Sequence, residues 1–242
     1  MNWIVRQYRL TAFPSSQADG VVLPTWSGMF GTEALSAVRR AGVLNEEGDF
    51  NSLRVIVGSQ LRLRADLVIQ PIPTPDAPIV LKGEGLGSLL TAVAASREIL
   101  DRFLSLLPPV RRLAVGVVLV RPTQNKEESY ALLPEAIKTL GVNLAGTSDF
   151  TFQINRPRSS LIVRGLQLNR LAKWAAIRVG VLTVDAASSG VSHDYGEHAI
   201  QLELDMSTEA DRTTSVPAGT EGPLVKELES LAAEIAAHGD VA

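Results

Sequence analysis

The sequence predicts an α+β fold built on a largely antiparallel sheet, with helices packed on one face. Three observations support this class. Segments with the two-residue alternation of strands come in consecutive groups, not in strict alternation with helices. Long amphipathic helical segments separate these groups. In addition, 45% of the 242 residues are hydrophobic and 20% are charged, which supplies enough apolar side chains for a large core.

The first quarter of the chain predicts three strands and one helix. Residues 1–13 alternate like a strand and stop before a proline. Residues 32–41 have the apolar spacing of a helix and stop before a glycine. Residues 53–72 predict two strands. Leu61 and Leu63 belong to the inward-facing positions of the second one, because every other residue there is apolar.

The middle of the chain predicts a helix, a strand and a second helix. Residues 86–107 carry the clearest amphipathic pattern, which two prolines end. Residues 112–120 form an apolar run typical of a buried strand. Residues 126–140 predict the second helix. Pro134 lies inside it and should kink or split it, because proline lacks the amide hydrogen.

The last part of the chain predicts several strands and a final helix. The expected strands are one that starts at Phe150 and stops before Pro157, followed by 161–171, 175–184 and 199–206. Proline in such a pattern ends a strand or marks an edge strand. Residues 223–237 have helical spacing and begin with a proline, which suits the first helical turn.

We expect residues 1–242 to form a single α+β domain. The halves 1–122 and 123–242 are loosely similar, because each combines pairs of strands with one long helix. The alternative of two related sub-halves therefore stays open.

Composition narrows the class of protein. The chain has no cysteine, which excludes disulfides, thiolate nucleophiles and cysteine-bound zinc. Its longest apolar runs, near residues 113–120 and 179–184, are much shorter than a membrane span. The first ten residues are interrupted by Arg6, Gln7 and Arg9, unlike a secretion signal. We therefore expect a cytoplasmic, bacterial-type protein with no membrane segment and no cofactor.

The main functional signal is a concentration of positive charge. No acidic residue occurs between Asp149 and Asp185, although the net charge of the whole chain is −3. Guanidinium groups match phosphates and carboxylates, amides add neutral donors, and an indole ring can stack on a base. If the strands here are neighbours, their outward faces could form a surface for an anion, a nucleic acid or a partner protein. The candidate residues are Asn155, Arg156, Arg158, Arg164, Asn169, Arg170, Lys173 and Trp174.

A structural explanation of the same residues stays open. Sheets carry Arg and Lys on solvated faces, where these residues discourage edge-to-edge pairing. Trp174 could belong to the core instead of the surface. Glu203 and Asp205, on a neighbouring strand, could neutralise part of the positive charge.

A second cluster has the residue types of a metal site but not the spacing. His193, Asp194, Glu197 and His198 lie within six residues, and such side chains bind divalent ions. The two histidines are five positions apart and flanked by glycine, so they would not share one face of a helix. We expect a solvated loop here and no bound metal.

These observations favour a non-catalytic binding or assembly protein over an enzyme. We expect it to be oligomeric or part of a complex, because no catalytic motif has both the right spacing and the right context. A two-signed surface and exposed strand edges suit a protein partner or self-association. Nucleic-acid binding through the basic segment is the alternative. A metal-dependent hydrolase centred on the 193–198 loop is the third hypothesis.

Overall fold

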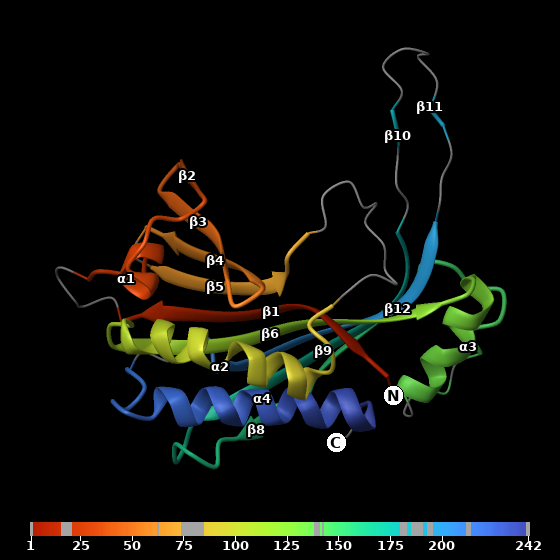
Figure 1. Ribbon diagram of the computed structural model, residues 1–242. Helices are drawn as coiled ribbons and strands as arrows, with labels where there is room; N and C mark the ends of the chain where they lie inside the picture. The colour runs from red at the N-terminus through yellow and green to blue at the C-terminus, as the bar shows by residue number, and fades with distance from the viewer. Residues whose placement is uncertain are drawn as a thin grey trace.

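The computed structural model describes residues 2–15, 21–61, 63–73, 85–137, 141, 143–179, 183–184, 191–192, 196–211 and 214–240. In this part of the chain, four helices accompany an open, ten-stranded antiparallel sheet (Figure 1). The expected α+β class is therefore confirmed.

The strand order is β2-β3-β4-β5-β1-β6-β12-β9-β7, with β8 paired to β9 beside β7. The N-terminal strand β1 lies in the middle, between β5 and β6. The bounds in the large sheet are β1 (Ile4–Pro14), β2 (Ser36–Arg40), β3 (Val43–Phe50), β4 (Leu53–Gln60), β5 (Arg64–Pro71), β6 (Val110–Thr123), β7 (Thr151–Asn155), β8 (Arg158–Ser159), β9 (Gln167–Val179) and β12 (Glu197–Thr208). A separate two-stranded sheet pairs β10 (Thr183–Val184) with β11 (Val191–Ser192).

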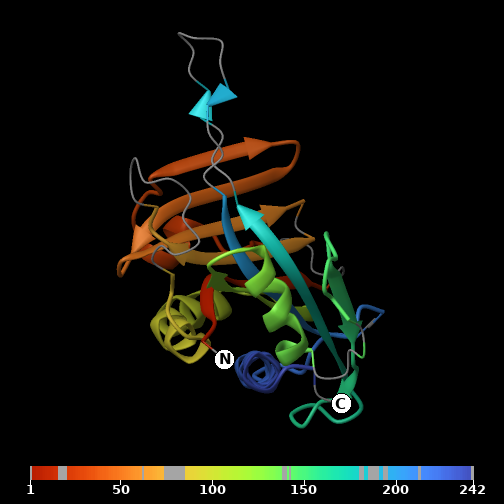
Figure 2. The ribbon, with the colours of Figure 1, turned by 90° about the vertical axis from the view of Figure 1, so that its right-hand side faces the viewer.

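The long helices α2 (Leu89–Ser105) and α4 (Glu221–His238) lie side by side on one face of the sheet. Figure 2 shows α4 almost end-on, with α2 next to it and the strands above both. The short α1 (Trp26–Phe30) packs beside α2, and α3 (Lys126–Ala136) packs against the β9 and β12 end. These positions confirm three of the four expected helices and the single covered face.

The core lies between this face and the helices. Tyr8 and Leu10 on β1, and Leu202 on β12, point toward the helices and are fully buried. The intervening residues of the central strands, such as Arg9 and Glu203, point to the opposite face. Alternation along each strand therefore produces one apolar and one polar face. We call the second one the open face.

The expected helix over residues 32–41 is wrong. Residues 36–40 are strand β2, which pairs with β3 through a two-residue turn. Ala41 and Gly42 in that turn both have positive φ, 48° and 80°, as a type I′ hairpin turn requires. The apolar spacing resembled a helix, but the turn chemistry decides the structure.

Two other expectations need adjustment. Leu61 and Leu63 lie at the turn between β4 and β5, where their side chains are 61% and 57% exposed, instead of inside a strand. The two strands expected over 161–171 and 175–184 are largely one strand, β9, which covers residues 167–179. In the first case β4 and β5 pair up to Gln60 and Arg64, so both leucines fall in the turn between the strands.

Candidate functional site

The predicted basic segment lies on β7, β8 and β9. These strands are neighbours, as the hypothesis of a shared surface required. Successive residues of β9 point to opposite faces. Arg170 points toward α4, whereas Lys173 lies on the open face beside Glu203. The cations are therefore divided between two faces and do not form one surface.

On the helix side, Arg156 binds the chain segment that follows α4. Its Nε and Nη2 atoms donate to the two carboxylate oxygens of Asp240, at 2.7 and 2.8 Å. The Asp240 side chain is buried, so the two-point contact supplies the positive charge that this carboxylate needs. The hydrogen bonds to Asp240 raise the pKa of Arg156 above its usual value.

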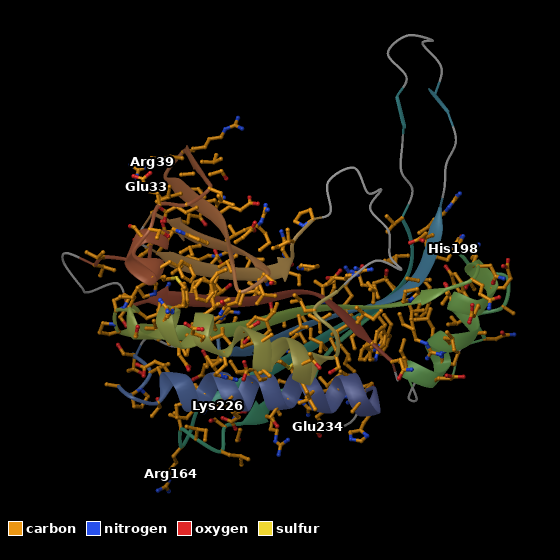
Figure 3. All side chains as sticks on the ribbon, in the orientation of Figure 1. Glu33, Arg39, Arg164, His198, Lys226 and Glu234 are labelled. Carbon is orange, nitrogen blue, oxygen red and sulfur yellow. The ribbon has the colours of Figure 1, made fainter. Side chains whose placement is uncertain are left out.

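Arg158 and Arg170 face the same helix. Arg158 Nη1 lies 3.5 Å from Glu234 Oε2, and Arg170 Nη2 lies 3.8 Å from the same oxygen. Arg170 is only 4% exposed. Figure 3 shows Glu234 on the lower side of α4 in that view. Together with Arg156, these cations bind the C-terminal helix to the sheet.

The loop after β8 adds two further contacts to α4. Glu227 accepts hydrogen bonds from the hydroxyl of Ser160 and the backbone N–H of Leu161, both at 2.6 Å. We call the contacts of Arg156, Arg158, Arg170 and this loop with α4 the helix clasp. Three arginines of the basic segment, Arg156, Arg158 and Arg170, therefore have a structural role, which is to attach α4 to the sheet.

Trp174 belongs to the core. Its ring is fully buried, and its centroid lies 5.9 Å from that of Phe152. It therefore has no surface on which a base could stack, and the core explanation applies. By contrast, Arg164 is exposed and points away from the body of the molecule (Figure 3).

The remaining members of the basic segment lie on the open face. Lys173 Nζ is 3.3 Å from both carboxylate oxygens of Glu203. Asn155 Nδ2 donates to Asn169 Oδ1 at 3.0 Å, and Asn155 Oδ1 accepts from the backbone N–H of Arg170 at 2.9 Å. The expected neutralisation by Glu203 is thus confirmed, and the amides join β7 to β9.

Next to Lys173, the open face is hollowed over five strands. The hollow has a volume of about 300 Å³ and runs from β1 across β6 and β12 to β9 and β7. Its lining includes cations, carboxylates and amides, namely Gln7, Arg9, Gln153, Lys173, Glu203 and Asp205. We call this surface the polar hollow.

Arg9 and Asp205 form the second charged pair of the polar hollow. Arg9 Nη2 lies 4.0 Å from Asp205 Oδ2, a distance at the limit of an ion pair. Within the described structure, Arg9 Nε and Asp205 Oδ1 are both buried and have no hydrogen-bond partner. Gly116 makes room for the guanidinium, since a Cβ atom there would lie 3.1 Å from Arg9 Nε. These two atoms are shielded from solvent, whereas the two side chains as a whole are 39% and 38% exposed.

The sequence indicated the polar hollow only in part. Lys173, Glu203 and Asp205 attracted attention, but Arg9 and Gly116 did not. Their signal was the alternation of polar residues along β1 and β12. The alternation alone does not show that these residues lie together, because β1 and β12 are nearly two hundred residues apart in the sequence. They come close only because both strands pair with β6.

The proposed metal cluster is described only in part. Glu197 and His198 are the first residues of β12, and His198 lies near the α3 end of the sheet (Figure 3). His193 and Asp194 lie outside the described residues. Across the described ranges, no group of three or more His, Asp or Glu side chains has an arrangement that could hold a metal ion.

Comparisons with known proteins leave the family open. The chain matches no protein-family model, and none of the curated proteins compared with it is similar in sequence. None of the helices in the described part of the chain combines the length and apolar character needed to cross a membrane.

Proposed function

We propose that this is a non-catalytic binding or assembly protein whose partner is another protein that contacts the open face. The observation that carries the proposal is the polar hollow. It presents two cations and two carboxylates in a depression whose lining residues all belong to strands β1, β6, β7, β9 and β12. Because the polar hollow carries both positive and negative side chains, it complements a partner protein, whose surface also carries both signs of charge.

The edge strand β7 supports the same surface. Among the described strands it pairs only with β9, and it lies at the end of the sheet order, with Pro157 close behind it. Thr151, Gln153 and Asn155 are exposed on this strand. An extended segment of a partner could therefore pair with β7 while its side chains reach the polar hollow.

Nucleic-acid binding receives less support. Three of the candidate arginines are engaged by acids of α4 or of the segment that follows it. In the polar hollow, Glu203 and Asp205 would repel a phosphate backbone. Arg164 remains exposed, but it lies at the far side of the molecule from the polar hollow. We also propose a cytoplasmic location, because the chain has no cysteine.

Site-specific photo-crosslinking tests the proposal. A benzophenone amino acid replaces Gln153, beside the polar hollow, in cells that naturally make the protein. The matched control replaces Leu90, which is 75% exposed on the helix side. We expect one discrete protein adduct from position 153, none from position 90, and loss of the adduct with Lys173→Glu. Equal adducts from both positions, or none from position 153, would contradict the proposal.

A salt titration decides between protein and nucleic acid. We expect the purified protein to bind labelled DNA and RNA weakly at low salt, with little change between wild type and the pair Arg156→Ala and Arg170→Ala. Strong binding that falls steeply with salt and depends on these arginines would favour the nucleic-acid alternative.

A further inference from the structure

The opposite edge of the sheet is formed by strand β2. Among the described strands β2 pairs only with β3, and the side chains of all five of its residues are exposed. Val38, at its centre, is 59% exposed. Exposed edge strands present unpaired backbone groups that favour pairing with another strand.

The hairpin fixes which backbone groups of β2 are available. Arg40 and Val43 flank the two-residue turn, so they form a hydrogen-bonded pair. Hydrogen-bonded and non-bonded pairs then alternate along the ladder. Consequently the N–H and C=O groups of Ala37 and Arg39 point to the free edge, while those of Val38 point toward β3.

Charge is distributed along this edge so that it complements itself. Arg39 and Arg40 lie at the turn end of β2, and neither forms an ion pair among the described residues. Figure 3 shows Arg39 and Glu33 at the outer end of the ribbon, away from α2 and α4. Glu46 and Glu47 lie on β3, directly behind the small side chains of Ala37 and Ser36. Within the chain, Glu46 Oε2 accepts a hydrogen bond from the backbone N–H of Trp26 at 2.8 Å and Glu47 Oε1 pairs with Arg54, so an arginine of a second copy would share these carboxylates.

We propose that two copies of this chain associate through antiparallel pairing of β2 with β2, centred on Val38. In this register Ala37 of one copy faces Arg39 of the other, so the outward backbone groups meet. Ser36 faces Arg40, and the two Val38 side chains contact each other. Each arginine can reach across a small residue to Glu46 or Glu47 of the other copy.

Other registers satisfy fewer of these conditions. A shift by one residue would oppose outward backbone groups to inward ones. A shift toward the turn would place Arg39 opposite Arg39, where like charges repel. A shift the other way would bring Leu35 into the ladder, where the chain bends. The Val38-centred register is the one that keeps all five residues paired.

The interface is small, so we expect the dimer to depend on concentration. Stable interfaces bury about 1,200–2,000 Å², and five paired residues on each side provide less. The proposed dimer uses strand β2, which lies at the other end of the sheet from the polar hollow. Its failure would therefore leave the proposed partner surface untouched, and the reverse also holds.

Cysteine crosslinking tests both the dimer and its register. The chain has no cysteine, so Val38→Cys introduces a single thiol at the twofold axis. Non-bonded antiparallel pairs have Cα atoms about 4.5 Å apart, a separation that a disulfide spans. Under mild oxidation we expect Val38→Cys to form a covalent dimer about tenfold faster than the exposed control Leu90→Cys, because pairing raises the effective thiol concentration.

A mixture of two variants tests the register itself. Ser36→Cys and Arg40→Cys should each crosslink slowly alone and rapidly when mixed, since residue 36 faces residue 40. Ala37→Pro in the Val38→Cys background should abolish the dimer, because it removes an outward N–H that β3 does not use. Its circular dichroism and melting temperature serve as the folding control.

Two results of these crosslinking experiments would overturn the proposal. The proposal is overturned if Val38→Cys crosslinks no faster than Leu90→Cys. It is equally overturned if Ser36→Cys alone reacts as fast as the mixture. If Ala37→Pro proves unfolded, the double charge reversal Arg39→Glu and Arg40→Glu replaces it, and undiminished crosslinking of that variant counts against the pairing.

Discussion

The carboxylate of Glu229 joins three elements of the molecule. It accepts a hydrogen bond from the Tyr8 hydroxyl of β1 and another from Arg97 Nη2 of α2, both at 2.8 Å. Glu229 itself lies on α4 and is buried. Burial and the nearby carboxylate raise the pKa of Tyr8 well above its usual value. Tyr8 therefore keeps its proton at alkaline pH values at which an ordinary tyrosine ionises.

The raised pKa of Tyr8 makes stability depend on alkaline pH. The folded state holds the phenol proton more tightly than the unfolded state, so this contribution is fully present below the unfolded pKa of about 10. It is lost as the pH rises toward the folded pKa. We expect urea unfolding to show a free energy of unfolding that falls above about pH 10.

The variant Tyr8→Phe isolates this effect. At pH 7 we expect a loss of about 1–3 kcal/mol, because Glu229 stays buried with one donor fewer. Above about pH 10 the variant should lose stability less steeply than wild type. Tyr130→Phe, which leaves the Glu229 contacts intact, is the control. A steep decline in Tyr8→Phe equal to that of wild type would refute the assignment.

Among the elements, α4 depends on the helix clasp. Arg156→Ala removes both hydrogen bonds to the buried Asp240. We expect faster amide hydrogen exchange in the last two turns of α4 and little change in α2, because the loss is local. Arg158→Ala is the matched control, since its contact with Glu234 is longer and more exposed. Equal exchange in the two variants would mean that the contact between Arg156 and Asp240 does not hold this end of the helix.

The approach to α2 depends on a glycine. Gly85 lies beside β1, where Leu86 N–H donates to Val5 C=O at 2.8 Å. A Cβ atom at residue 85 would lie 2.7 Å from that carbonyl oxygen. We therefore expect Gly85→Ala to lower the free energy of unfolding by about 1–3 kcal/mol, measured by urea denaturation. The control is Gly222→Ala on α4, where an added Cβ atom would meet open space; we expect this variant to be neutral or stabilised by up to about 1 kcal/mol. If both variants were destabilised equally, the close approach of residue 85 to β1 would not be the cause of the loss.

The sequence predicted elements better than it predicted their neighbours. The two long helices follow from amphipathic periodicity, β1 and β12 from the alternation of polar and apolar residues, and β6 from a continuous apolar run. Strand β2 was missed because its five residues are too few to show a clear strand alternation, and the apolar spacing around them resembled that of a helix. The division of the basic segment was missed for another reason. The face that each cation occupies depends on the register of β9 and on the position of α4.

At the scale of the whole molecule, one core cluster includes residues of both halves. Trp26 and Trp174 both belong to it. We therefore expect the chain to unfold as one domain. Two variants with a single tryptophan, one retaining Trp26 and one Trp174, allow a test. In each, urea transitions followed by fluorescence and by far-UV circular dichroism should coincide. Separate transitions would instead support independent sub-halves over 1–122 and 123–242.

The bond from Tyr8 to Glu229 also has a consequence for synthesis on the ribosome. Glu229 follows Tyr8 by 221 residues, which takes roughly 10 to 40 s at ordinary rates of translation. Strands β6 and β12 are made before α4, so during part of that interval their apolar face lacks the helix that packs against it. A nascent chain with an unfinished hydrophobic face is a substrate for ribosome-associated chaperones. We therefore expect the nascent chain to expose this apolar face until α4 has been made and has packed against the sheet.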